Sequence, residues 1–292
     1  MTDFKRVLAA TDGSEHGLNA VVTGAAWAAR AGASLEVATV VEVLLLPPEY
    51  APPGVEPAEY ELAFVRDARE KAEKQAEEAG AVGVPVHVRA GLTPQLVNRI
   101  ADETDSDLIV IGASPQPARG SLVGSTGRRT LYLAQRPVLL ASEARREPFR
   151  RVLVAVDLSE MSGPVLEAAW ALAEADGAEL RVLYVLEPLP LMLAKAASID
   201  ESERLRHGRE QMEAVLEGTG LLGEDSVQAR MREGRAGHEI LEEAQGWDAD
   251  LVAVGTHGFG FFDRLLLGST PLYVLRHGQR ATLIVPRREA GD

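Results

Sequence analysis

Short apolar runs rich in β-branched residues alternate along the chain with longer segments whose apolar residues recur at every third or fourth position. Residues 4–11 and 251–254 belong to the first kind, and residues 18–29 and 165–173 belong to the second. The first pattern predicts buried strands and the second predicts amphipathic helices. Their regular alternation is typical of parallel βαβ units.

The order of these segments repeats at about half the length of the chain. Residues 4–11 precede Asp-Gly-Ser, and residues 149–156 precede Asp-Leu-Ser. Each half is expected to form an open, doubly wound, Rossmann-like α/β domain with a five-stranded parallel sheet and four helices. The expected strands are residues 4–11, 34–41, 84–89, 107–111 and 137–141 in the first half, and residues 149–156, 178–186, 227–231, 250–254 and 282–285 in the second.

The helices between these strands differ in character. Long charged helices are expected at residues 58–79 and 201–216, and short helices at residues 96–101 and 239–244. The charged segment at residues 142–148, which ends in a proline, is the expected linker. We therefore place the two domains at residues 1–146 and 147–292.

Composition restricts the classes of partner. The formal net charge of −14 argues against a nucleic-acid surface, which needs clustered Lys and Arg to displace counterions. The absence of cysteine excludes disulfides and thiolate chemistry. No stretch reaches the roughly 18 apolar residues of a membrane span, and residues 1–6 lead into a strand rather than a signal-peptide core. We expect a cytoplasmic location.

The most informative loop follows the run at residues 251–254. It begins with Gly255 and Gly258, and it ends with Gly268, Ser269 and Thr270 before a segment with helical spacing. Glycines let the backbone turn with positive φ and approach a ligand closely. We expect an N-cap hydroxyl at the helix start and a proline near its first position, where unpaired N–H groups favour an anion such as phosphate.

The spacing of this loop resembles a known signature. Two residues separate Gly255 from Gly258, and nine separate Gly258 from Gly268-Ser269. This spacing is similar to the nucleotide-binding signature of the universal stress protein family, in its ATP-binding branch, and the resemblance covers both halves. It implies a tandem protein with an adenine nucleotide alpha hydrolase-like fold, whose halves pair as an intrachain pseudo-dimer through their last strands. A homodimer of the whole chain stays open.

The resemblance also implies roles for individual residues. In the family the aspartate after the first strand contacts adenine, as does the backbone of a valine near the end of the second strand; these positions are Asp157 and Val185. Asp157 could instead cap the following helix, and the loop glycines could be simple turn residues. Leu158 departs mildly from the family, which often has glycine there. The nucleotide-binding residues implied for the second half are Asp157, Ser159, Val185, Gly255, His257, Gly258, Gly268, Ser269 and Thr270.

The first half carries a degenerate version of the loop. Pro115 occupies the place of the second glycine, and the loop is one residue shorter. Proline fixes φ and removes an N–H donor, so this turn cannot cradle phosphate in the family's manner. Arg119, Arg128 and Arg129 could still hold an anion. The residues of this weaker second site are Asp12, Val40, Gly112, Gly124, Ser125 and Thr126.

Support for catalysis is poor. The chain contains no GxxxxGK[ST] segment, and no His has partners at the spacing of a nucleophilic triad. We expect no catalytic residues and at most slow ATP hydrolysis.

The ligand is expected to be ATP, with ADP or AMP as alternatives, possible Mg²⁺ and no assigned metal ligands. Three hypotheses remain: an ATP-dependent stress-response switch for an unknown protein partner, a slow ATPase, and a nucleotide-independent interaction protein. The proline-rich segments at residues 46–57 and 188–193 are either stiff connectors or a lid or partner-binding patch.

Overall fold

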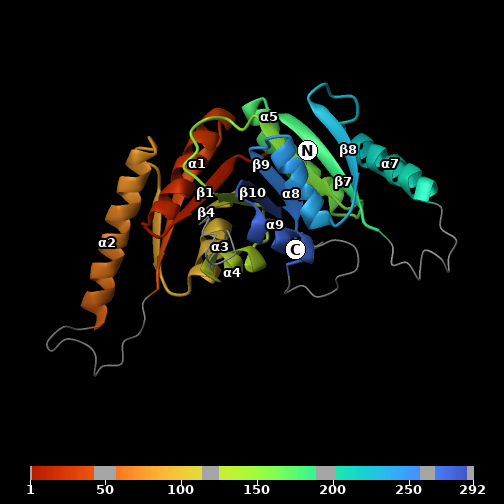
Figure 1. Ribbon diagram of the computed structural model, residues 1–292. Coiled ribbons are helices and arrows are strands. Elements are labelled where there is room, and N and C mark those ends of the chain that lie inside the picture. Colours follow the sequence, from red (N-terminus) through yellow and green to blue (C-terminus); the bar gives the residue numbers. More distant parts are fainter. Residues whose placement is uncertain (1, 43–56, 114–124, 189–200, 257–266, 288–292) are drawn as a thin grey trace. The chain divides into compact units, whose positions relative to one another are not determined.

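The computed structural model describes residues 2–42, 57–113, 125–188, 201–256 and 267–287 (Figure 1). Apart from the first three residues, which group with the second unit, the described chain divides into two compact units. The N-terminal unit spans residues 4–147 and the C-terminal unit begins at Pro148. Each unit is an α/β domain with its own parallel sheet.

The N-terminal unit has five strands in the spatial order β3-β2-β1-β4-β5, and all neighbouring pairs are parallel. Its strands are β1 (Arg6–Thr11), β2 (Ser34–Val41), β3 (Val86–Ala90), β4 (Leu108–Gly112) and β5 (Val138–Ala141). Its helices are α1 (Glu15–Ala31), α2 (Pro57–Glu78), α3 (Thr93–Glu103) and α4 (Ser125–Leu133).

The C-terminal unit repeats this topology in the order β8-β7-β6-β9-β10, again with parallel pairs. Its strands are β6 (Arg151–Val156), β7 (Glu179–Leu186), β8 (Val227–Glu233), β9 (Leu251–Gly255) and β10 (Ala281–Val285). Its described helices are α5 (Ser162–Asp176), α7 (Glu201–Gly218), α8 (Ala236–Gly246) and α9 (Ser269–His277).

Helices cover both faces of each sheet. In the N-terminal unit α1 contacts α2 and α3 contacts α4, and in the C-terminal unit α5 contacts α7 and α8 contacts α9 (Figure 1). The central strands are therefore buried on both sides, which explains why β4 and β9 read as continuous apolar runs. The strand order reverses between β1 and β4 and between β6 and β9, and ligands of such sheets bind at the carboxyl ends beside this reversal.

The expected doubly wound α/β fold with two parallel sheets is confirmed. The strand expected at residues 34–41 matches β2. The short helices are longer than predicted, because α3 and α8 each begin three residues before the apolar positions that revealed them. Their first turns contain Pro94 and Gly237, residue types of low helix propensity, so the sequence pattern alone does not reveal these turns.

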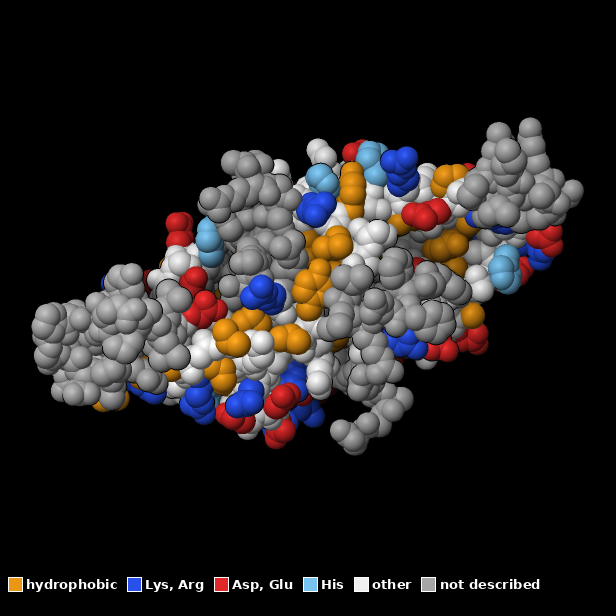
Figure 2. All heavy atoms as spheres, turned by 90° about the horizontal axis from the view of Figure 1, so that it is seen from below, with side chains coloured by type: hydrophobic (Ala, Val, Ile, Leu, Met, Phe, Trp, Pro, Cys, Tyr) orange, Lys and Arg blue, Asp and Glu red, His pale blue; other side chains and the backbone are white. Residues whose placement is uncertain are grey.

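The described surface is polar and mixed in charge. Within the described ranges, none of the helices combines the length and the apolar character needed to cross a bilayer. Figure 2 shows Lys and Arg side chains interspersed with acidic and apolar ones on the face that it displays.

Candidate functional site

Asp157 stands directly after β6, at the carboxyl end of a strand inside the sheet. Its Oδ1 atom accepts hydrogen bonds from the Ser159 N–H at 3.0 Å, the Ser159 hydroxyl at 2.6 Å and the Ser162 hydroxyl at 3.3 Å. Because Ser162 is the first residue of α5, these bonds tie the strand end to the helix start. The carboxylate is held in place as a hydrogen-bond acceptor beside the crevice.

Leu158 adopts a left-handed backbone conformation in this turn, with φ of 62°. Its counterpart in the first half, Gly13, has φ of 78°. Side chains with a Cβ adopt this region at a cost of about 1–2 kcal/mol. The leucine therefore keeps the glycine-type turn but introduces strain directly beside Asp157.

Strand register brings predicted residues of the second half to one edge of the sheet. Val156 of β6 pairs with Tyr184 of β7, so Asp157 and Val185 follow at the same level. Gly255 ends β9, the neighbour of β6 on its other side. Three positions that lie about 30 to 100 residues apart in the sequence thus share the carboxyl edge at the reversal in strand order.

Tyr184 is a neighbour of Asp157 that the sequence analysis did not identify. Burial raises the pKa of its phenol, the carboxylates of Asp157 and Glu187 raise this pKa further, and Arg204 opposes them. Its ring packs on Gly208 of α7, where an added Cβ would lie 2.8 Å from the ring atom Cε1. The phenol keeps its proton at neutral pH and is a potential donor near the crevice.

The start of α9 corrects one expectation. The N-cap position is Gly268, which makes no side-chain cap, and Ser269 is already the first helical residue. The expectation of an N-cap hydroxyl at this helix start was therefore wrong. The Gly268 N–H donates to the Thr256 carbonyl at 2.9 Å, whereas the N–H groups of Ser269 and Thr270 have no acceptor within the described part of the chain. Two backbone donors at the positive end of α9 are thus available to an anion.

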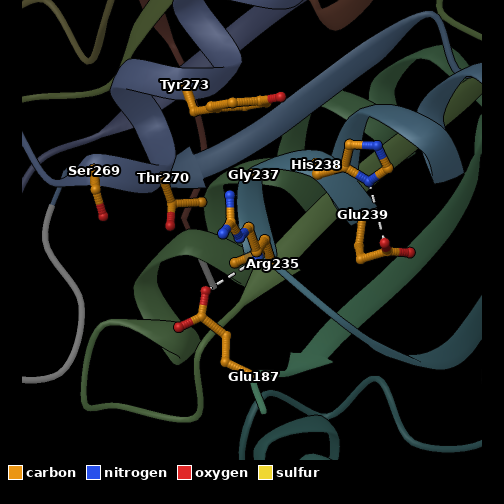
Figure 3. A pocket seen from close by; sticks show the side chains of 9 residues that line it. Glu187, Arg235, Gly237, His238, Glu239, Ser269, Thr270 and Tyr273 are labelled. Carbon is orange, nitrogen blue, oxygen red and sulfur yellow. Dashed lines mark hydrogen bonds and ion pairs between the residues drawn. The ribbon is translucent and has the colours of Figure 1, made fainter. Parts of the chain in front are cut away.

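A pocket of about 420 Å³ opens at this helix start. Ser269, Thr270 and Tyr273 of α9 form one wall, residues 235–239 at the start of α8 form the opposite wall, and Glu187 after β7 forms the floor. Figure 3 shows Arg235 directed toward the Thr270 side, while His238 turns away toward Glu239. The Glu187 carboxylate accepts the Ala236 N–H at 3.0 Å. The pocket thus combines two helix starts with one bound carboxylate.

Arg235, Tyr273 and Glu187 are pocket residues that the sequence analysis missed. They lie on three elements whose proximity arises only from the parallel topology. The internal repeat offered one signal, because Arg235 occupies the place of Leu92 in the first half. Both residues stand at the N-cap of the short helix with similar backbone angles, φ −81° and ψ 120° for Arg235 and φ −78° and ψ 112° for Leu92.

An ion-pair network supports the start of α8 from the sheet. Arg232 of β8 donates to Glu239 at 2.7 Å and to Glu243 at 2.9 Å. The hydrogen bond from Arg232 lowers the pKa of Glu239. Burial would raise the pKa of Glu243, but hydrogen bonds from Arg232 and Arg181 outweigh it and the net pKa is lowered. Both carboxylates are ionised at neutral pH and hold α8 on the sheet.

The corresponding edge of the first half is closely packed. Gly112, at the end of β4, lies against the backbone carbonyl of His16 so closely that a Cβ would collide with it. Above this contact the buried Gln75 of α2 bonds to the Thr11 hydroxyl and to the Ser14 carbonyl. The Ser14 hydroxyl caps α1 by accepting from the Gly17 N–H at 3.1 Å, and the exposed Asp12 accepts from the Ser14 N–H at 2.9 Å.

Several predicted positions lie outside the described residues. These are His257, Gly258, Pro115, Arg119 and Gly124, together with the side chains of Ser125, Thr126 and Arg128. Val40 of β2 is described and stands level with Asp12, because Thr11 pairs with Thr39. Within the described ranges no group of three or more His, Asp or Glu side chains is placed to hold a metal ion.

Sequence comparison identifies the family. The model of the universal stress protein family matches residues 3–142 and again residues 148–286. The chain belongs to the universal stress protein family. It is a tandem member, with one family match in each half.

Relatives and solved structures agree with this assignment. A universal stress protein of Mycobacterium bovis is 27% identical over 269 residues, which cover 87% of this chain and 90% of the relative. A universal stress protein of Synechocystis is 31% identical over 153 residues, covering 47% of this chain and 97% of the relative. The crystal structure of a universal stress protein from Archaeoglobus fulgidus has a TM-score of 0.71 at 21% identity, covering 98% of this chain and all of the other, and it supports the fold.

Proposed function

We propose that this universal stress protein binds an adenine nucleotide, with ATP the first candidate, in its C-terminal half. The observation that carries the proposal is the shared sheet edge of Asp157, Val185 and Gly255, together with the open start of α9. The Asp157 carboxylate, a hydrogen-bond acceptor, and the backbone of Val185 suit the polar edge of adenine, and free N–H groups at a helix start suit phosphate. The N–H groups of Ser269 and Thr270 would receive the phosphates, Gly268 would let them approach the backbone closely, and Ser159 would hold Asp157 in place.

The proposed role of the nucleotide is regulatory. Binding would bias the protein between two surface states and so change which protein partner it meets in a stress response. A ligand shifts such an equilibrium only by its differential affinity for the two states. The loop residues His257 and Gly258 belong to this proposal on sequence grounds alone. Pairing of the two halves as a pseudo-dimer and the domain boundary at residues 146 and 147 also stay predictions.

A slow ATPase is the weaker alternative. The chain lacks the GxxxxGK[ST] segment that supplies the lysine and the Mg²⁺-binding hydroxyl of a P-loop, and no His has partners at the spacing of a nucleophilic triad. Mg²⁺ would therefore reach the site bound to the phosphates rather than to a protein cluster.

The first test is a calorimetric titration of nucleotide-stripped protein with ATP and Mg²⁺, read for stoichiometry as well as affinity. We expect one site per chain, because Pro115 interrupts the loop of the first half at the place of the second glycine. Two sites would contradict the degenerate first half.

A second outcome would favour an interaction protein without nucleotide. Absence of heat at millimolar ATP, confirmed by equilibrium dialysis with labelled ATP, would refute the nucleotide proposal. The exposed Leu62 and Phe64 of α2, 59% and 53% accessible, favour this second candidate function because large apolar side chains gain by association.

A further inference from the structure

The pocket at the start of α9 contains a cation to which the sequence assigned no role. Arg235 is exposed, and its guanidinium makes no ion pair or hydrogen bond with any described residue. Figure 3 shows it facing the start of α9 across the pocket. An arginine offers five N–H donors in a planar fork that matches the oxygens of a phosphate.

Glu187 decides which helix start remains open to an anion. Its carboxylate already accepts the Ala236 N–H at the start of α8, so the positive end of that helix is neutralised. The start of α9 has no such carboxylate within the described part of the pocket. A phosphate chain in the pocket would therefore have α9 on one wall and Arg235 on the other.

The two halves carry side chains of different charge at the position of Arg235. Leu92 takes the place of Arg235 at the equivalent helix start and is 66% exposed. The half with the interrupted loop thus has an uncharged side chain there, and the half with the intact glycine spacing has an arginine. Since the backbone angles match, the difference lies in the side chain and not in the turn.

We propose that Arg235 is an anchor for the outer phosphates, so that the C-terminal half prefers nucleoside di- and triphosphates to monophosphates. This inference rests on the proposed nucleotide site and adds a selectivity to it. An anchor across the pocket from α9 contacts only phosphates that extend beyond the first. Arg235 binds and selects; it takes no part in bond breaking.

The test compares the affinities of ATP, ADP and AMP for four proteins by calorimetry. They are the wild type, Arg235→Leu, Arg235→Lys and Arg209→Leu. The leucine variant copies the side chain found at position 92, so the turn accommodates it, and thermal unfolding checks that the fold is kept. Arg209 is an exposed arginine of α7 outside the pocket, and its replacement changes the net charge by the same amount.

We expect Arg235→Leu to weaken ATP and ADP at least tenfold and to change AMP less than twofold. Arg235→Lys should lie between, because an ammonium keeps the charge and loses the fork, and Arg209→Leu should match the wild type. Equal losses for AMP and ATP, or no loss for either, would overturn the inference.

Tripolyphosphate, a probe without adenine, separates this inference from the nucleotide proposal. If the wild type binds tripolyphosphate but shows no preference for adenine nucleotides, and Arg235→Leu weakens it tenfold, the phosphate anchor stands and the adenine proposal falls. If the wild type binds neither the nucleotides nor tripolyphosphate, both are wrong.

Discussion

Gly112 lies in direct backbone contact with the carbonyl group of His16, at the point where β4 ends beneath the first turn of α1. This contact has room for hydrogen and not for a methyl group. We expect Gly112→Ala to lower the free energy of unfolding by about 1–3 kcal/mol through overpacking. Urea denaturation followed by circular dichroism measures it. Gly163→Ala is the matched control, because a Cβ there meets nothing within 4 Å and should change stability by less than about 0.5 kcal/mol.

The turn after β6 makes a second prediction, through the positive φ of Leu158. At ordinary positions alanine is more stabilising than glycine, but here alanine keeps the strain and glycine removes it. We therefore expect Leu158→Gly to be more stable than Leu158→Ala by about 1 kcal/mol. Both variants lose the leucine side chain, so their difference in urea midpoint isolates the backbone term. The reverse order would show that the turn is unstrained.

Asp157 and Asp12 form a natural pair of variants for ligand binding, because both follow the first strand of their half. Asp157→Ala is expected to weaken ATP about tenfold, the value of one lost hydrogen bond of roughly 1.4 kcal/mol. Asp12→Ala should leave the affinity unchanged, since the first half is expected to hold no nucleotide. Fluorescence competition with a labelled ATP analogue measures both. Equal losses would mean that both halves bind, and unchanged affinity in both would remove Asp157 from the site.

Glu243 supports a prediction about stability. Arg181 is 9% exposed, donates to Glu243 at 2.7 Å and to Gln228 at 2.7 Å, and lies 4.1 Å from the centre of the Trp247 ring. Glu243→Ala leaves this buried guanidinium without its carboxylate and should cost about 3 kcal/mol, as measured by urea denaturation. The neighbouring exposed Glu242 provides the control, and Glu242→Ala should cost less than about 0.5 kcal/mol.

The same carboxylate predicts a pH dependence. Since the pKa of Glu243 is lowered in the folded state, its contribution to stability is present above the ordinary value of 4.5 and is lost as the pH falls below it. Glu243→Gln should therefore lose less stability than the wild type between pH 5 and about pH 3. Parallel slopes for the two proteins in that range would show that another group controls acid unfolding.

The fold was predictable because strands that are buried on both faces consist of continuous apolar runs, and because the same order of strands and helices occurs in both halves of the chain. The positions of Asp157 and Gly255 were predictable because they stand at the ends of strands that the sequence marks clearly, whereas Val185 was singled out only through the family resemblance. The start of α9 was less predictable, because residue type favours a serine cap over a glycine cap and the backbone nevertheless places Gly268 at the N-cap. Arg235 could not be placed, because nothing local in the sequence joins the start of α8 to the start of α9.

The sheet edge and the helix starts that line the pocket differ in how firmly backbone hydrogen bonds hold them. Val185 and Gly255 belong to β7 and β9, which have a strand on either side in the C-terminal sheet, whereas Arg235 and Ser269 stand at helix starts whose first amides lack intrahelical partners. In hydrogen–deuterium exchange the amides of β7 and β9 should stay protected until global unfolding, while the helix starts exchange by local opening. Ligand binding should then slow amide exchange in the first turn of α9, while the exchange rates of the sheet amides stay unchanged.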